Sequence, residues 1–306
     1  MNQLLVSVII CTHNPRRDYL DRVLEALKQQ TLRQEQWELL LIDNASDRVL
    51  ADEIDLSWHF QAHHIREEQL GLTPARLRGI RESQAELLIL VDDDNVLAPN
   101  YLETARDLSQ QWTMIGAWGG QVLPEFEEQS QAWIKPYWGN LALKELDADR
   151  WGNIPQNEFL PCGAGMCLRR SVAQQYVKLV QAQSMRMQLD RKGKSLMSGG
   201  DTDIAFTACH MGLGIGVFKA LMLTHLIPKF RLQEDYLLRL QEAMYYSGIV
   251  MQANWGNLPV RTWRTRFAGY ARRWFMDARS RRFHDAAQRG IDAALRDLAQ
   301  MQLKDS

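Results

Sequence analysis

The sequence predicts an α/β fold, built on a mostly parallel sheet with helices on both faces. Short apolar runs over residues 4–11, 37–42 and 86–91 have the length and branched aliphatic content of strands that are buried on both faces. Segments with helical periodicity over 19–30 and 71–83 separate these runs. Strands that alternate with helices in this way form a parallel, doubly wound sheet.

The rest of the chain is predicted to divide into two parts. Beyond residue 111 the pattern loosens, and tryptophans occur among prolines in loop-like sequence. The other predicted elements are a third strand over 60–65, a helix opened by Pro99, a glycine-interrupted strand over 160–169, a helix over 204–211 and an apolar run over 216–225. Because residues from about 230 onward are mostly helical, we predict one domain over 1–230 and a helical, arginine-rich C-terminal extension over 231–306.

The composition is that of a globular protein with a substantial core. The 306 residues are 46% hydrophobic and 24% charged, and the net charge of −1 provides no global field that would attract nucleic acid. The four cysteines are scattered without a CxxC pair, which is typical of a reduced protein. No signal peptide is visible, and no apolar stretch approaches the roughly 20 residues that span a bilayer. We therefore expect a cytoplasmic protein.

Polar residues follow three of the predicted strands where each strand ends. They are Thr12 to Asn14 after the first, Asp43 after the second, and Asp92, Asp93 and Asp94 after the fourth. Ligand sites of doubly wound sheets lie at this edge. Three adjacent carboxylates are costly unless a cation neutralises them, and hard divalent cations prefer oxygen ligands. The triplet therefore predicts a cation that bridges two phosphates, although an acidic loop or a helix cap before Pro99 is the alternative.

An ordered set of motifs resembles the inverting family 2 glycosyltransferases, which have a GT-A, Rossmann-type fold. The segments are 8–14 (VIICTHN), 40–47 (LLIDNASD), 71–76 (GLTPAR) and 90–95 (LVDDDN), followed by Pro99. The resemblance covers roughly residues 4–230. It implies a nucleotide-sugar donor and a DXD-type metal motif that uses Mn²⁺ or Mg²⁺.

The resemblance also implies roles on the donor side. Thr12 and Asn14 would line the nucleotide pocket, and Asp43 would hydrogen-bond the base, expected to be uracil. Arg76 would lie near the phosphates, although Leu77 follows it where many relatives carry asparagine. The residue-based alternatives are two turn formers, a helix cap and a surface ion pair, respectively.

The resemblance implies a separate role for each residue of the acidic triplet. Asp92 and Asp93 would contact ribose and donor sugar, directly or through the metal. Asp94 would be the principal metal ligand. His225, which ends the apolar run over 216–225, would complete the metal shell or touch the diphosphate, unless it is a histidine satisfied within the core.

An inverting transfer needs a carboxylate that removes the acceptor proton. The segment 199–203 (GGDTD) resembles the acidic motif of the family, with Gly200-Asp201 where the usual pair is Glu-Asp. We predict Asp201 as the general base. Asp203 is the second candidate, and it could equally cap the helix predicted from residue 204.

A glycine-rich segment at 160–166 (LPCGAGM) resembles the part of the family that lines the donor sugar and the acceptor. Gly163 would let the backbone approach a ligand closely. A β-bulge or a sheet corner is the alternative.

The C-terminal extension carries an aromatic face with a basic flank. Trp263, Phe267, Tyr270 and Trp274 recur at helical spacing among eight arginines between 261 and 282. Two interpretations are open: an interfacial helix on anionic lipid at the inner face of the membrane, or packing against the domain or in a homodimer. Membrane contact would favour a lipid-linked acceptor.

The sequence thus predicts a metal-dependent inverting glycosyltransferase that moves a sugar from a UDP-sugar to an acceptor hydroxyl. The acceptor is expected to be a glycan, a lipid-linked sugar or a small molecule, in surface glycan, polysaccharide or glycolipid synthesis. The alternative is a non-catalytic relative that binds a nucleotide sugar or scaffolds a glycan assembly complex. A nucleotidyltransferase is disfavoured because the turn over 12–15 (THNP) lacks a glycine-rich, basic loop.

Overall fold

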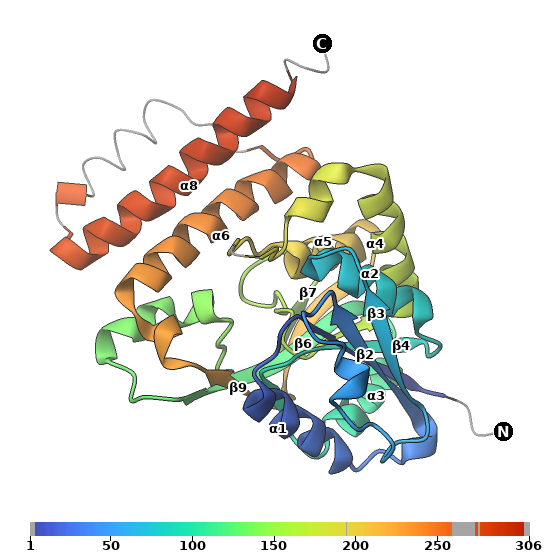
Figure 1. Cartoon of the computed structure of the whole chain (residues 1–306). Coiled ribbons are helices and arrows are strands. Elements are labelled where there is room, and N and C mark those ends of the chain that lie inside the picture. Colours follow the sequence, from blue (N-terminus) through green and yellow to red (C-terminus); the bar gives the residue numbers. More distant parts are fainter. Residues whose placement is uncertain (1–3, 194, 259–272, 275, 303–306) are drawn as a thin grey trace.

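The computed structural model describes residues 4–193, 195–258, 273–274 and 276–302. Figure 1 shows a twisted sheet with helices around it and two long helices that run side by side. The sheet has nine strands in the order β3-β2-β1-β4-β8-β6-β9-β5, with β7 paired to β9. The predicted α/β class is therefore confirmed.

The first half of the sheet is parallel, as predicted. Its strands are β1 (Val6–Thr12), β2 (Trp37–Asn44), β3 (Ala62–Glu67) and β4 (Leu87–Asp92). β1 pairs in parallel with both β2 and β4, so that Thr12 lies opposite Asp43 and Cys11 opposite Asp92. This register brings the polar residues at the strand ends to one edge of the sheet.

Helices cover both faces because alternate strand residues join different cores. Val8 and Ile10 of β1 pack with α1 and α3, whereas Ile9 packs with α2, α4 and α5. The five helices are α1 (Arg17–Lys28), α2 (Leu72–Glu82), α3 (Tyr101–Gln111), α4 (Arg170–Ala182) and α5 (Gly200–His210).

The second half of the sheet is mixed. Its strands are β5 (Asn95–Leu97), β6 (Ile115–Phe126), β7 (Arg150–Gly152), β8 (Met166–Arg169) and β9 (Gly214–Ile227). β6 runs parallel to β9, but β8 is antiparallel to both β4 and β6. Only the end of the strand predicted over 160–169 is a strand, and the loop before it contains Gly163.

The C-terminal helices pack on the rest of the chain. α6 (Glu234–Asn254) pairs with α8 (Ala278–Gln302), and Glu234 accepts hydrogen bonds from Arg279 and Arg282. Phe283 of α8 is buried against η3 (Ala132–Leu141), a 3₁₀ segment beside α6 in Figure 1. The described part of α8 therefore packs within the chain, which is one of the two arrangements left open for the extension.

Two further predictions about the extension have different outcomes. Trp263, Phe267 and Tyr270 lie outside the described residues, whereas Trp274 is exposed. Within the described ranges, no helix combines the length and the apolar character needed to cross a membrane.

Candidate active site

A cavity of about 630 Å³ opens at the carboxyl ends of β1, β2 and β4. Thr12, Asn44 and Asp92, the last residues of these strands, all line it. The rest of the lining comes from the loops before β8 and α5, from η3, from β9 and from the segment that leads into α6. Its members include Gly139, Lys144, Gly163, Asp190, Asp201, His225, Arg231 and Tyr236. The cavity therefore brings together most of the predicted site residues.

The acidic triplet lines the cavity at the end of β4. Asp92 ends β4, Asp93 and Asp94 form the turn, and β5 begins with Asn95. Because β5 pairs with β9, Asn95 lies opposite His225, and the histidine reaches Asp94. The Nε2 atom of His225 lies 3.2 Å from a carboxylate oxygen of Asp94.

Asp94 is surrounded by cationic groups and donors. Arg231 Nη1 lies 3.1 Å from the same Asp94 oxygen, and Asn95 Nδ2 donates to the other at 3.0 Å. Burial by itself would raise the pKa of Asp94, but His225 and Arg231 hold this pKa well below its usual range. Asp94 is therefore ionised and already has partners in this structure.

Asp93 and Asp92 have a different electrostatic environment. Burial, with the charge of Asp94 added, raises the pKa of Asp93 to about 7, although the Thr12 hydroxyl donates to its carboxylate. Burial also raises the pKa of Asp92, and the Arg76 guanidinium opposes that rise. A bound cation would relieve the repulsion that remains among the three carboxylates.

The protein offers two ligands for such a cation. No cluster of three or more His, Cys, Asp or Glu side chains among the described residues is arranged to hold a metal ion. Asp94 and His225 nevertheless converge, and carboxylate oxygen with imidazole nitrogen is a suitable donor set for Mn²⁺. Mg²⁺ sites commonly use one or two carboxylates and complete the shell with water and substrate phosphates. The residues therefore fit a cation whose remaining ligands come from the substrate.

Asp201 faces the cavity from the first turn of α5. Its carboxylate accepts hydrogen bonds from the backbone N–H groups of Gly163 and Thr202, each at 2.8 Å. A Cβ atom at position 163 would lie 2.7 Å from Arg76 Nη2, so that a larger residue there requires the arginine or the loop to shift. Gly163 therefore lies in close contact with Arg76 and Asp201 in the cavity wall, and its approach to a ligand stays a prediction.

Asp203 does not line the cavity, which corrects its prediction as the second candidate base. Its side chain is fully buried, forms an ion pair with Arg186 and accepts a hydrogen bond from Trp255 Nε1 at 2.6 Å. It is no helix cap either, because α5 begins at Gly200, four residues before the predicted start, with Gly199 as its N-cap. Asp203 instead anchors α5 to α6.

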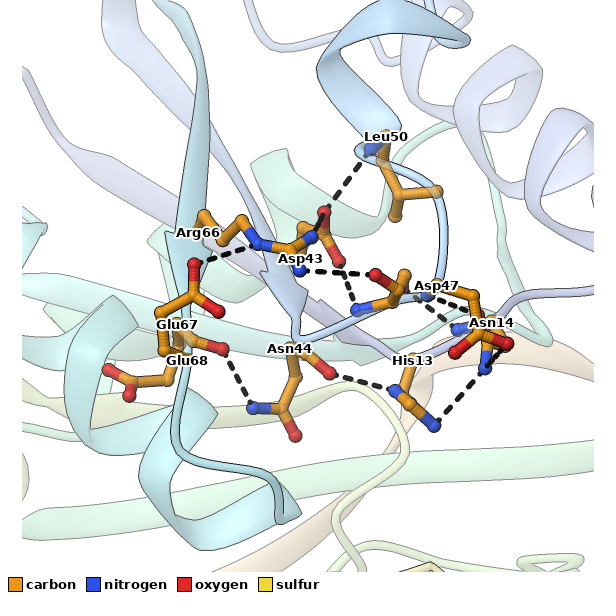
Figure 2. A network of polar contacts seen from close by, with 10 residues as sticks. His13, Asn14, Asp43, Asn44, Asp47, Leu50, Arg66, Glu67 and Glu68 are labelled. Atoms are coloured by element: carbon orange, nitrogen blue, oxygen red, sulfur yellow. Dashed lines mark hydrogen bonds and ion pairs between the residues drawn. The ribbon is translucent and has the colours of Figure 1, made fainter.

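Asp43 also stands outside the cavity lining, and Figure 2 shows why. Its two oxygens accept hydrogen bonds from the backbone N–H groups of Ser46 and Leu50 and from Arg66 Nη1, at 3.0, 3.2 and 2.7 Å. Burial raises the pKa of Asp43, but these hydrogen bonds outweigh burial and lower it. Asp43 is therefore held by the loop after β2 and by Arg66 in this structure, and its hydrogen bond to the base stays a prediction.

Asn44, the next residue, lines the cavity in its place. Its Nδ2 atom donates to the carbonyls of Glu67 and Gln69, and its Oδ1 accepts from Gly71 N–H at 2.8 Å. The side chain thus fixes the loop between β3 and α2, which forms one wall of the cavity.

Asn14 is not among the residues that line the cavity, and its contact with the nucleotide stays a prediction. It has a positive φ of 48°, accepts from Asp47 N–H at 2.9 Å and joins the loops after β1 and β2, as Figure 2 shows. Asn14 is therefore a turn former, which was the alternative, and its neighbour His13 reaches the cavity.

Asp190 and Lys144 line the cavity without any signal in the sequence, whereas Arg76 was predicted from its motif. Arg76 is buried and pairs with Asp190 at 3.2 Å, across 114 positions of the chain. Lys144 Nζ donates to the Leu160 carbonyl at 2.7 Å, and burial lowers the pKa of this lysine. Both contacts join positions far apart in the chain, and Asp190 and Lys144 lie in irregular segments, so that no periodicity or local motif marks these two residues.

The family model described as glycosyl transferase family 2 matches residues 7–177, which is more than half of the chain. The chain therefore belongs to glycosyl transferase family 2. This membership confirms the resemblance of the motifs and makes the protein a transferase by class.

Among named proteins, the chain is similar to an uncharacterized glycosyltransferase of Methanocaldococcus jannaschii. The two are 20% identical over 272 residues, which is 84% of this chain and 81% of the relative. The glucosyl-dolichyl phosphate glucuronosyltransferase of Haloferax volcanii is 27% identical over 126 residues, or 40% of this chain and 39% of the relative.

Among solved structures, the chain is similar to TarS 1-349 of S. aureus. The match has a TM-score of 0.50 and 13% identity, and covers 95% of this chain and 83% of the other. TarS 1-349 in complex with UDP-GlcNAc matches with a TM-score of 0.54 and 12% identity, over 84% of this chain and 68% of the other. At these identities the likeness concerns the fold, and it agrees with the GT-A-like arrangement.

Proposed function

We propose that the protein is an inverting glycosyltransferase that moves a sugar from a UDP-sugar to an acceptor hydroxyl and uses Mn²⁺ or Mg²⁺. The observation that carries the proposal is one cavity that joins an acidic strand-end cluster to a separate carboxylate, Asp201. Family membership supports sugar transfer. The TarS complexes with UDP and UDP-GlcNAc support UDP as the carrier.

On the donor side, Arg231 and Arg76 lie where the diphosphate charge would develop. Arg231 adjoins Asp94, as does the imidazole of His225. The positive charge of Arg76 acts on Asp92 and opposes the rise in its pKa. Preorganised positive groups stabilise a leaving group as its negative charge grows. A divalent cation held by Asp94 and His225 would add Lewis-acid neutralisation of the same charge. Thr12 and His13 would line the part of the cavity that holds the nucleoside.

On the acceptor side, Asp201 would accept the hydroxyl proton while the acceptor oxygen attacks the anomeric carbon from the face opposite the diphosphate. The bond from the anomeric carbon to the phosphate oxygen breaks, and UDP leaves. The anomeric carbon of the product then has the opposite configuration from that of the donor. The N–H groups of Gly163 and Thr202 hold the carboxylate in place for this transfer.

The acceptor class is open among a glycan, a lipid-linked sugar and a small molecule. The name of the Haloferax volcanii relative refers to glucosyl-dolichyl phosphate, which makes a lipid-linked acceptor the first class to screen. A role in surface glycan, polysaccharide or glycolipid synthesis is consistent with all three classes.

A ligand screen followed by product analysis tests the proposal. A ligand that binds only the folded state raises its thermal midpoint, so nucleotide sugars are screened with Mn²⁺ and the best donors are tested for UDP release. We expect at least one UDP-sugar to stabilise the protein and to turn over, with an inverted anomeric carbon in the product by NMR. If UDP binds but no donor turns over, the alternative of a non-catalytic binding or scaffold protein replaces this proposal.

A further inference from the structure

We infer that Asp190 is a positioning residue of the active site, whose carboxylate takes the place of the side chain that Gly200 lacks. It joins the donor residue Arg76 to the helix that carries Asp201. The inference rests on the proposed function, because it assigns Arg76 to the donor and Asp201 to the acceptor.

The hydrogen bonds of Asp190 connect two helices through one carboxylate. The residue lies in the loop before α5 and is buried, with 6% of its surface exposed. Its Oδ1 atom accepts from Gly200 N–H at 3.1 Å, at the first residue of α5. Its Oδ2 atom accepts from Thr73 Oγ1 at 3.0 Å and from Arg76 Nη1 at 3.2 Å, both on α2. Every oxygen of this buried carboxylate is therefore used between the two helices.

Gly200 shows that the Asp190 carboxylate occupies side-chain space of position 200. A Cβ atom there would lie 2.1 Å from Asp190 Oδ2 and 2.6 Å from Asp190 Cγ, so that no larger residue fits while Asp190 is present. In a glutamate the carboxyl carbon stands two bonds beyond Cβ, which is about 2.5 Å. The carboxyl carbon of Asp190 therefore lies at the distance that a glutamate at position 200 would reach, while its Oδ2 atom lies closer to Cβ than a glutamate oxygen would. Glutamate is the residue of the acidic motif that the segment 199–203 otherwise resembles.

The position of Arg76 follows from this contact. Asp190 holds Nη1, and the other terminal nitrogen, Nη2, faces Gly163, whose N–H in turn donates to Asp201. Asp92 and Asp201 also interact with the charge of Arg76, but Asp190 is the carboxylate that pairs with it directly among the described residues, and breaking a buried ion pair is unfavourable. Asp190 thus positions both the guanidinium of Arg76 and the first turn of α5, the helix that carries Asp201.

A relocation experiment tests the inference. Asp190→Ala removes the carboxylate, and we expect kcat to fall on the order of 10²-fold because the reacting groups lose their alignment. Adding Gly200→Glu to Asp190→Ala restores a carboxylate from the other side, and we expect at least a tenfold recovery. Gly200→Glu alone clashes with Asp190 and lowers kcat. Rescue by a second carboxylate is an outcome that a merely structural role would not produce.

The matched control is Asp203→Asn, which changes another buried carboxylate of α5 outside the cavity. It should lower the thermal midpoint but retain kcat below that midpoint. Asp190→Asn, which keeps the shape of the side chain, covers the case in which Asp190→Ala does not fold. We expect it to lower kcat and to weaken UDP binding through Arg76.

Two results would overturn the inference. The first is a double variant that is folded but no more active than Asp190→Ala. The second is an Asp190→Asn variant with the kcat and UDP affinity of the wild type. If the wild type itself turns over no UDP-sugar, the proposed function fails. The affinity of the same variants for UDP, measured by calorimetry, then tests this inference. We expect Asp190→Ala to weaken UDP binding and the added Gly200→Glu to restore part of it.

Discussion

Asp43 shows how the fold can use a carboxylate that a motif assigns to a ligand. Both of its oxygens accept hydrogen bonds from the loop after β2 and from Arg66 of β3, and its pKa is lowered as a result. It therefore shapes the loop behind the cavity. The motif was recognisable in the sequence, but the direction of its side chain depends on the loop geometry, which the sequence did not reveal.

Asp43→Asn should therefore destabilise the fold more than it affects the ligand. The folded pKa lies below the unfolded value, so ionised Asp43 stabilises the protein above the unfolded pKa of about 3.9. That contribution is lost as the pH falls through the lower folded pKa. We expect the variant to lose about 1–3 kcal/mol at pH 7 in denaturant unfolding, with a smaller difference from wild type below about pH 4. A variant of normal stability that no longer binds UDP would instead support the base-binding role.

Gly163 carries a sharper prediction, because a Cβ atom there would lie 2.7 Å from Arg76 Nη2. Gly163→Ala must push Arg76 or the loop away from Asp201, and we expect kcat to fall on the order of 10- to 10²-fold. Steady-state UDP release measures the loss. Gly248→Ala in α6 is the control, since a Cβ atom there has no neighbour within 4 Å. Equal rates for Gly163→Ala and wild type would show that the close approach has no catalytic role.

Asp190 illustrates what single-sequence analysis could not find. Gly200-Asp201 was recognised as a departure from the usual Glu-Asp pair, and Asp201 lies in the cavity. The compensating carboxylate comes from an irregular loop that contacts Arg76 across 114 positions. Such contacts are set by tertiary packing, so no local pattern marks them.

Strands and helices were easier to predict where their patterns are local. β1, β2 and β4 are continuous apolar runs, and they were found within a few residues of their ends. β6 was missed because Gly119 and Gly120 interrupt its pattern. Gly120 is required there, since a Cβ atom would lie 2.1 Å from the Leu221 carbonyl oxygen of the neighbouring strand β9. A contact between strands so far apart in sequence could not be predicted.

The segment η3 links the C-terminal helices to the cavity, and it gives a further prediction. Phe283 of α8 stacks on Tyr137 at 3.7 Å between ring centroids, while Gly139 of the same segment lines the cavity. We expect Phe283→Ala to cost about 3–5 kcal/mol of stability and to raise the KM for the acceptor, because η3 loses its support. The KM for the donor should stay unchanged.

Acceptor and donor titrations of the purified variant check this expectation. Trp274→Ala serves as the control, since this side chain is 86% exposed and should change neither constant. A rise in the donor KM alone would mean that η3 belongs to the donor side.

The molecule as a whole closes its cavity with segments from both halves of the chain. Thr12 and Asp94 lie in the first hundred residues, whereas Asp201, His225 and Arg231 come from the second half. The predicted boundary at residue 230 runs beside the cavity, and Tyr236 and Met244 of α6 lie beyond it in the lining. Ligand binding therefore connects both predicted parts.

Global stability should consequently respond to the donor nucleotide. UDP with Mn²⁺ at 100 times its dissociation constant should stabilise the fold by about 2.7 kcal/mol. Asp94→Asn should remove the part of this stabilisation that depends on Mn²⁺, because Asp94 is one of the two protein ligands expected for the cation. Differential scanning calorimetry with and without a chelator measures both effects. A stabilisation by UDP that is the same in the variant and in the chelator would exclude the metal from donor binding.

The most direct test of the two-sided site is the rate of sugar transfer by Asp201→Asn at saturating donor, measured beside its affinity for UDP. The Asp201 carboxylate lies in the cavity wall apart from the acidic triplet, so its neutralisation should leave UDP binding unchanged. We expect kcat to fall by about 10²- to 10⁴-fold, the usual contribution of a general base. A variant that transfers sugar at the rate of the wild type would show that Asp201 is not the base.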